Sequence, residues 1–226
     1  MVNLIYVLID EKFNDSLNIK GEVFKYLVKA RRHNEGDEIN IRYKNDIKNL
    51  YKYEIDSIEN RSLNLRLLSS SLCEIKSKKD LHIGWCLIDI KSIEKVLPSL
   101  SEIGVSKITF IECERSQKNF KLDFKRFERI LEASMQQCGR SSYIEFDIAK
   151  SIQEFVGVYP QTKVFDFCDN ILDSNSAFNT VLIGCEGGFS QNEKSLLQTQ
   201  ENFKLDTPMV LRSESAAMAV ASKILL

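Results

Sequence analysis

A change in hydrophobic periodicity near residue 72 constrains the fold of this chain most strongly. Before this point, apolar residues alternate with polar ones in several short runs. The clearest runs are Ile39, Ile41 and Tyr43; Tyr51, Tyr53 and Ile55; and Leu63, Leu65 and Leu67. A period of two residues is typical of strands with one buried face, so residues 1–72 are expected to form a small antiparallel β-barrel. One helical insert is expected at residues 21–32, where apolar side chains recur at helical spacing.

Beyond residue 80, runs typical of strands alternate with runs typical of helices. Strands are expected at 81–90, 107–111, 144–149, 163–167 and 180–184, and a long helix is expected to end at Gly139. Another helix includes Pro98, so it either begins there or is kinked. This alternation predicts an α/β domain with a mainly parallel sheet over residues 81–226. Residues 73–80 lack periodicity and are expected to be a linker.

The charge balance limits how the chain could bind a nucleic acid. With 31 Lys and Arg against 32 Asp and Glu, the net charge is -1, so phosphate would have to be bound by local basic patches. The insert offers Lys25, Arg31 and Arg32, and the stretch from Arg115 to Arg129 carries six basic and two acidic residues, Arg126 among them. Each patch is either an RNA-binding surface or a solvated helix face.

The start of the chain and its cysteines predict a location. No basic segment precedes the first apolar run, and no apolar run approaches the roughly 20 residues that a bilayer requires. Six cysteines are scattered singly among only two histidines, which makes a zinc site improbable and predicts reduced thiols. We therefore expect a soluble, cytoplasmic protein without metal.

Residues 180–193 have the pattern of a ligand-binding loop. An apolar strand leads into Gly184, Gly187 and Gly188, and Ser190 with Glu193 fits a capping box that opens a helix. Glycines allow close approach of backbone to a ligand, and open α/β sheets bind small molecules at the carboxyl ends of strands. The string lacks both phosphate-loop patterns, and a tight structural turn is the alternative.

A second string precedes a C-terminal helix rich in small residues. Arg212 and Glu214 lie at its start, and Ser213 is a candidate N-cap. Such a helix can pack closely against another backbone, including that of a second subunit. Ordinary helix-start chemistry is the alternative interpretation for Glu214, because an acidic residue is favourable near a helix N-terminus.

Four motifs in order resemble those of the SPOUT methyltransferases. They read S-E-I-G-V, E-A-S-M-Q-Q-C-G-R, I-G-C-E-G-G-F-S and L-R-S-E-S-A, and the resemblance covers about residues 81–226. The chain is most similar to the bacterial family that methylates N3 of a uridine in 16S ribosomal RNA. It departs from the usual motifs at Cys185, which replaces a proline, at Thr207, where glycine is usual, and at Met209, where arginine is common.

The resemblance implies a domain with a deep C-terminal trefoil knot, preceded by a PUA-like RNA-binding barrel. It implies a homodimer that binds S-adenosylmethionine without metal and acts on 16S ribosomal RNA or the small ribosomal subunit. The implied cofactor-binding residues are Ile183, Gly184, Glu186, Gly187, Gly188, Leu205, Val210, Leu211, Arg212, Ser213 and Ala216. The candidate substrate-binding residues are Lys25, Arg31, Arg32, Arg115, Arg126 and Arg140.

Methyl transfer to a uracil nitrogen sets the expected chemistry. The nucleophile and the methyl carbon must be held about 3–3.5 Å apart and in line. The N3 proton must also be removed, or the resulting anion stabilised, and arginine can do the latter. Candidate catalytic residues are Arg140, Glu186, Arg212 and Glu214. A ribose 2'-O-methyltransferase of the same superfamily and a non-catalytic RNA-binding assembly factor remain alternatives.

Overall fold

The computed structural model describes residues 5–116, 121–173 and 178–226, and the chain divides into two compact units. Unit 1 comprises Met1–Lys76 together with Met135–Ser142, and unit 2 comprises Ser77–Ser134 together with Tyr143–Leu226. The segment 135–142 therefore clusters with unit 1, although the sequence pattern assigns it to the C-terminal domain. Residues 73–80 contain neither helix nor strand. None of the helices over the described residues has the length and apolar character needed to cross a membrane.

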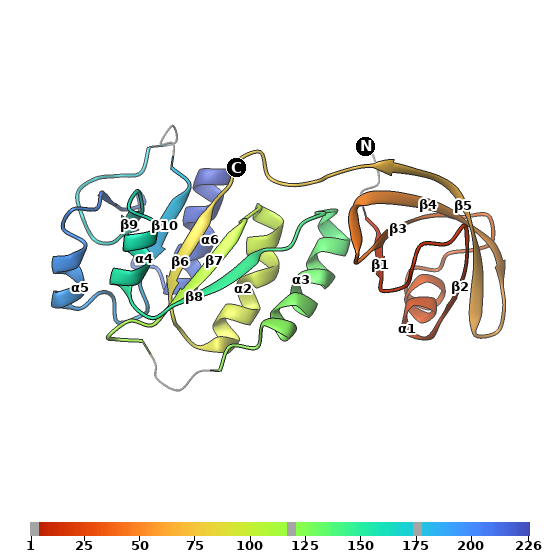
Figure 1. Cartoon of the computed structure of the whole chain (residues 1–226), viewed down its shortest axis with the longest axis horizontal. Coiled ribbons are helices and arrows are strands. Elements are labelled where there is room, and N and C mark those ends of the chain that lie inside the picture. The colour runs from red at the N-terminus through yellow and green to blue at the C-terminus, as the bar shows by residue number, and fades with distance from the viewer. Residues whose placement is uncertain (1–4, 117–120, 174–177) are drawn as a thin grey trace. The chain divides into compact units, whose positions relative to one another are not determined.

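Unit 1 is built on a five-stranded sheet (Figure 1). Its strands are β1 (Val7–Ile9), β2 (Ser16–Lys20), β3 (Glu38–Tyr43), β4 (Asp46–Ile58) and β5 (Ser62–Leu72), in the order β1-β3-β4-β5-β2. Along β2 alternating side chains are buried, namely Leu17 and Ile19, as the period of two predicts, whereas all three residues of β1 are buried. The pairings are antiparallel except that of β1 with β3, which is parallel.

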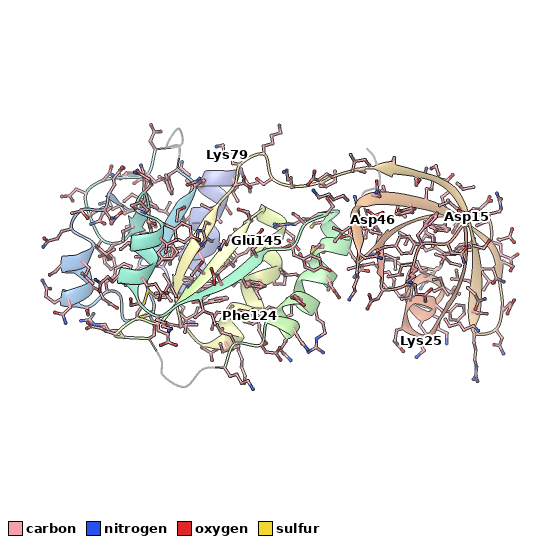
Figure 2. All side chains as sticks on the ribbon, in the orientation of Figure 1. Asp15, Lys25, Asp46, Lys79, Phe124 and Glu145 are labelled. Carbon is pink, nitrogen blue, oxygen red and sulfur yellow. A yellow bond between two sulfur atoms is a disulfide. The ribbon has the colours of Figure 1, made fainter. Side chains whose placement is uncertain are left out.

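The expected insert is helical, but it is not a regular α-helix. It begins as α1 (Gly21–Phe24) and continues as a π-helix, η1 (Lys25–Ala30). Phe24 and Leu27 point into the core formed by the sheet, whereas Lys25, labelled in Figure 2, is exposed. The insert therefore closes the core with its apolar face and leaves its basic side chains in solvent.

Unit 2 contains a six-stranded parallel sheet in the order β11-β9-β10-β6-β7-β8. Its strands are β6 (His82–Cys86), β7 (Lys107–Ile111), β8 (Glu145–Ala149), β9 (Lys163–Phe165), β10 (Thr180–Ile183) and β11 (Asn202–Phe203). Its helices are α2 (Ile90–Ile103), α3 (Phe124–Cys138), α4 (Ile152–Val158), α5 (Gln191–Leu196) and α6 (Ser213–Leu225). β6 and β10 are buried along their whole length, as expected for central parallel strands. The sheet is the parallel α/β sheet that the alternating pattern predicts.

The helix boundaries confirm one expectation and correct another. α3 ends before Gly139, whose φ of +87° favours glycine at this position. Of the two alternatives for the helix that contains Pro98, a start at Pro98 is wrong, because Pro98 lies inside α2. α2 already begins at Ile90, because the Asp89 side chain accepts a hydrogen bond from the Ser92 backbone N–H and caps it. Neither α4 nor β11 was predicted from the periodicity.

The prediction of reduced cysteines is wrong for two of the six. Cys86 ends β6 and Cys113 lies two residues beyond the adjacent β7, so the parallel pairing brings their Cα atoms within 5.8 Å. This distance suits a disulfide, which the structure forms between them. The pairing depends on strand order, which single, widely spaced cysteines do not reveal. Cys73, Cys138, Cys168 and Cys185 are free thiols.

Candidate functional site

A pocket of about 370 Å³ lies at the carboxyl ends of β9 and β10. One wall is the glycine loop, residues 184–188, which follows β10; the other is the C-terminal loop, residues 205–212, which precedes α6. All eleven residues predicted to bind a cofactor line this pocket: Ile183, Gly184, Glu186, Gly187, Gly188, Leu205, Val210, Leu211, Arg212, Ser213 and Ala216. Two segments that are well separated in the sequence therefore form one concave surface, of a volume typical of small-molecule sites.

The glycine loop turns tightly after β10. The Gly188 backbone N–H donates to the Cys185 carbonyl over 2.9 Å, and Gly188 has a φ of +64°, a conformation that side chains rarely adopt. A Cβ on Gly187 would lie 3.3 Å from the Cβ of Arg115, closer than an ordinary contact. The backbone path of the loop therefore favours glycine at 188, and close packing against Arg115 favours it at 187.

Glu193 connects the start of α5, which follows the glycine loop, to a neighbouring segment. Its Oε2 accepts from the Ser190 backbone N–H over 2.8 Å, which completes the predicted capping box of α5. Its Oε1 accepts from the Glu114 backbone N–H, also over 2.8 Å. Because Glu193 is only 5% exposed, both carboxylate oxygens are committed to backbone donors away from solvent. The carboxylate therefore joins the start of α5 to the segment that follows β7.

Arg115 extends this connection to the pocket itself. Its Nη1 donates to the Gly187 carbonyl over 2.7 Å, and its aliphatic carbons pack against Gly187. The sequence placed Arg115 among the substrate-binding candidates. In the structure its guanidinium is exposed beside the pocket wall, and one of its donors is used to hold the loop.

The C-terminal loop is more open than the glycine loop. Met209 is 66% exposed and Val210 is 76% exposed, although both line the pocket. The Thr207 hydroxyl accepts from the Met209 backbone N–H over 3.2 Å, within the same loop. This wall therefore has a hydrogen-bonded turn of its own and a largely solvated outer surface.

The start of α6 differs from the prediction. Arg212, not Ser213, occupies the N-cap position, and it makes no side-chain capping bond. Ser213 is the first helical residue, and its hydroxyl contacts Trp85 and the Gly184 carbonyl instead of a helix N–H. Ser213 does not cap the helix because these buried partners compete with the helix N–H groups for its hydroxyl. Glu214 lies in the first turn of α6 and does not line the pocket.

Few charged groups surround the mostly apolar pocket. Glu186 and Arg212 are exposed on opposite walls, and Asp166 is paired with Lys194 over 3.2 Å. Burial raises the pKa of the Cys185 thiol, which therefore stays protonated at neutral pH. Over the residues that the structure describes, no group of three or more acidic, His or Cys side chains is arranged to hold a metal ion.

The remaining candidate residues lie outside the pocket lining. Arg140 belongs to the segment that clusters with unit 1, where its carbonyl accepts from the Tyr6 hydroxyl over 2.7 Å. Burial lowers the pKa of Arg140, which is only 6% exposed. In unit 2, Arg126 is exposed and forms a bidentate ion pair with Glu94 through its Nε and Nη2 atoms.

The basic insert residues are all exposed in unit 1. Lys25 pairs with Glu22 over 2.6 Å, and the Arg31 guanidinium bonds to the Tyr26 hydroxyl over 2.8 Å while lying over its ring. Arg32 has a φ of +60°, rare for a residue with a side chain, and its carbonyl accepts from the Asn34 side-chain amide. The local turn thus leaves both arginines exposed, with Arg31 against the ring of Tyr26.

Sequence reasoning missed eight residues of the pocket lining. They are Phe165, Asp166, Phe167, Cys185, Phe189, Lys204, Thr207 and Met209. The first three belong to the expected strand at 163–167, and β9 pairs in parallel with β10. Carboxyl ends of adjacent parallel strands lie at one edge of a sheet, so this signal could have found them had the strand order been known.

Comparisons with known proteins show the family and the fold. Residues 76–225 match the family model described as RNA methyltransferase domain. The small-subunit ribosomal RNA methyltransferase E of Helicobacter pylori is 37% identical over 210 residues, covering 91% of this chain and 92% of that protein. The protein of the same name from Aquifex aeolicus is 25% identical over 90% of each chain. The enzyme of that name from Neisseria gonorrhoeae, solved with S-adenosylmethionine, shares the fold with a TM-score of 0.74 at 15% identity, over 96% of this chain and 95% of that one.

Proposed function

The chain belongs to the RNA methyltransferase family, in the group of small-subunit ribosomal RNA methyltransferases E, and on that premise we propose that it methylates N3 of a uridine in 16S ribosomal RNA. S-adenosylmethionine, when bound, supplies the activated methyl group. The single observation that carries the proposal is the pocket, in which two motifs distant in sequence form one concave surface.

The residues of the pocket fit this cofactor. Gly184, Gly187 and Gly188 add no side chains to the pocket, and the apolar walls suit a flat aromatic base. Glu186 places a carboxylate on the rim, which complements the positive charge of a sulfonium. Ile183, Leu205, Leu211 and Ala216 supply the apolar surface.

The proposed division of chemical labour uses charged residues at and near the pocket. Arg212 is exposed on the C-terminal loop and can stabilise the negative charge that develops on the uracil oxygens. Glu186, or alternatively Glu214 in the first turn of α6, accepts the N3 proton or orients an arginine. Arg115 and Arg140 are the further candidates for binding the uracil or an adjacent phosphate.

We further propose that the protein acts as a homodimer. Phe167, Met209 and Val210 are exposed apolar side chains at the pocket, and a second subunit would remove them from water. A second subunit would also bring further charged residues to the pocket.

RNA binding is assigned to both units. In unit 1, Lys25, Arg31 and Arg32 would contact the phosphate backbone, and the five-stranded sheet with its helical insert supports a PUA-like barrel. In unit 2, the exposed arginines Arg115 and Arg126 would contribute, and the order of the parallel strands supports a SPOUT domain with a C-terminal knot. Acting on ribosomal RNA, the protein would work in the cytoplasm.

Mass spectrometry of ribosomal RNA tests this function. RNA from cells lacking the protein should miss one N3-methylated uridine, and the purified protein with S-adenosylmethionine should restore it on small ribosomal subunits. A missing ribose 2'-O-methyl group would contradict the N3 assignment. No heat of binding with S-adenosylmethionine would instead favour a non-catalytic RNA-binding assembly factor.

RNA binding has its own test. Replacing Lys25, Arg31 and Arg32 together by alanine should weaken RNA binding and reduce its salt dependence, because a protein that neutralises fewer phosphates releases fewer counterions. Affinity for S-adenosylmethionine should not change. Replacing Lys44, Lys48 and Lys52, elsewhere in unit 1, provides a matched control for net charge.

A further inference from the structure

A buried serine hydroxyl connects the two walls of the pocket. The Oγ of Ser213, at the start of α6, donates to the carbonyl of Gly184 over 2.5 Å. Among the hydrogen bonds of the described residues, this is the one that joins residues 205–213 to the glycine loop. Ser213 is 5% exposed, so water does not readily replace the bond.

A tryptophan determines the direction of this bond. The indole Nε1 of Trp85 lies 2.9 Å from the Ser213 Oγ, and Trp85 is completely buried on β6. An indole nitrogen can only donate a hydrogen bond, so the serine oxygen must accept from it. The single hydroxyl proton is therefore left for the Gly184 carbonyl. The two bonds form a chain that runs from β6 through α6 to the end of β10.

The hydroxyl makes these bonds instead of a local one. A serine at the start of a helix commonly caps a backbone N–H, yet the N-cap of α6 is Arg212, which has no side-chain capping bond. Ser213 thus contributes to the contact between the loops and not to the end of its own helix. Its neighbours Arg212 and Leu211 face the pocket from the residues just before it.

We propose that Ser213 is a positioning residue, which holds the two walls of the pocket at the spacing required for S-adenosylmethionine, with Trp85 directing its hydroxyl. The inference rests on the proposed function of the pocket. Ser213 acts through the Gly184 carbonyl and the start of α6, so its loss affects cofactor binding more than the chemical step.

The test compares Ser213→Ala, Ser213→Thr and Trp85→Phe in the full-length protein. Ser213→Ala removes the link, so the Kd for S-adenosylmethionine should rise about tenfold, whereas kcat at saturating cofactor should change less than about threefold. Trp85→Phe keeps the Ser213 hydroxyl but removes the indole N–H that donates to it and orients it. This variant should raise the Kd for S-adenosylmethionine about threefold. Ser213→Thr keeps the hydroxyl and should recover the affinity. Ser222→Ala, on the same helix, is the matched control.

Intrinsic fluorescence can monitor this hydrogen bond, because Trp85 is the only tryptophan of the chain. Adding S-adenosylmethionine to the wild type should shift the Trp85 emission, and Ser213→Ala should reduce that shift at least by half. Thermal unfolding of each variant shows that it is folded at the temperature of the assay.

Two outcomes would overturn the inference alone. One is an unchanged Kd in both Ser213→Ala and Trp85→Phe, and the other is a loss that falls on kcat in place of the Kd. A wild-type chain that does not bind S-adenosylmethionine would overturn the proposed function, and this inference with it.

Discussion

The two walls of the pocket are held in different ways. The glycine loop is fixed by groups from outside it: Arg115 bonds to Gly187, and the buried Glu193 carboxylate joins the adjacent helix start to Glu114. The C-terminal loop has an internal turn at Thr207, exposed apolar side chains at Met209 and Val210, and the buried contact of Ser213 at its end. The comparison indicates that the glycine loop is preformed. The C-terminal loop is held by few contacts, and its conformation depends more on the proposed second subunit.

The largest expected effect comes from removing one charge from each wall. Glu186→Ala, on the glycine loop, and Arg212→Ala, on the C-terminal loop, should each lower the rate of methyl transfer by at least about 100-fold, because each removes electrostatic stabilisation of the transition state. Single-turnover assays with small ribosomal subunits measure this loss. Glu128→Ala and Lys91→Ala, which change exposed charges on α3 and α2, are the controls. Full activity in both site variants would contradict the assignment.

Acid should lower the free energy of unfolding through a buried histidine beside β10, the strand that leads into the glycine loop. His82 on β6 pairs with Thr180, the first residue of β10, and burial lowers the pKa of His82 to about 4, with the charge of Lys107 adding to the effect. Its pKa in the unfolded chain is near 6.5, so between these values protons bind mainly to the unfolded state. The stability is complete above about pH 6.5 and falls by about 1.4 kcal/mol per pH unit below it, or about 3 kcal/mol by pH 4.5.

Urea unfolding at pH 7 and at pH 4.5 measures this loss. His82→Gln removes the titrating group, so its free energy of unfolding should depend less on pH in this range. The matched control is His33→Gln, since His33 belongs to unit 1 and not to the sheet of unit 2. An unchanged pH dependence in His82→Gln would contradict the role of this histidine.

Glu193→Gln tests how much one buried carboxylate stabilises the structure next to the glycine loop. The amide keeps the shape but replaces one acceptor oxygen by a donor, which then faces a backbone N–H. We expect a loss of about 1–3 kcal/mol in the free energy of unfolding. Glu154→Gln changes the equivalent position of α4, where the carboxylate accepts from the exposed Lys150 N–H, and should cost less. Equal losses would mean that burial of the Glu193 contacts is unimportant.

The smallest effect is expected at the exposed Arg115. Arg115→Met keeps an aliphatic stem against Gly187 but removes the donor to its carbonyl. Since an exposed hydrogen bond contributes about 0.5–1 kcal/mol, the Kd for S-adenosylmethionine should rise about threefold. Titration calorimetry measures it, with Lys121→Met as control for the removed charge. If Arg115→Met raised the Kd as much as Ser213→Ala does, the two walls would not differ in how they are held.

Local signals in the sequence predicted the elements of the site well. The glycine loop, the capping box of Ser190 and Glu193, and the end of α3 at Gly139 depend on residues close together in the chain. The four motifs identified the family, and two of them contain nine of the eleven predicted cofactor-binding residues that line the pocket; Leu205 and Val210 lie outside the motifs. Hydrophobic periodicity separated strands from helices because burial of one face imposes a period on neighbouring residues.

Contacts between distant residues were not predictable in this way. The parallel pairing of β1 with β3, the disulfide of Cys86 with Cys113, and the contribution of Phe165–Phe167 to the pocket all follow from strand order. The hydrogen bonds of the Ser213 side chain were not predictable either. Its position predicts a helix cap, and only the approach of Trp85 and Gly184 gives its hydroxyl better partners.

By itself, the sequence determined most of the strands and helices, with α4 and β11 as exceptions, and the family to which the chain belongs, because these properties depend on local spacing and residue type. Tertiary structure alone decided which loops face each other, which cysteines pair and where the hydroxyl of Ser213 points. Those outcomes depend on the order of strands in a sheet, and strand order is set by the packing of the whole unit and not by any single stretch of residues.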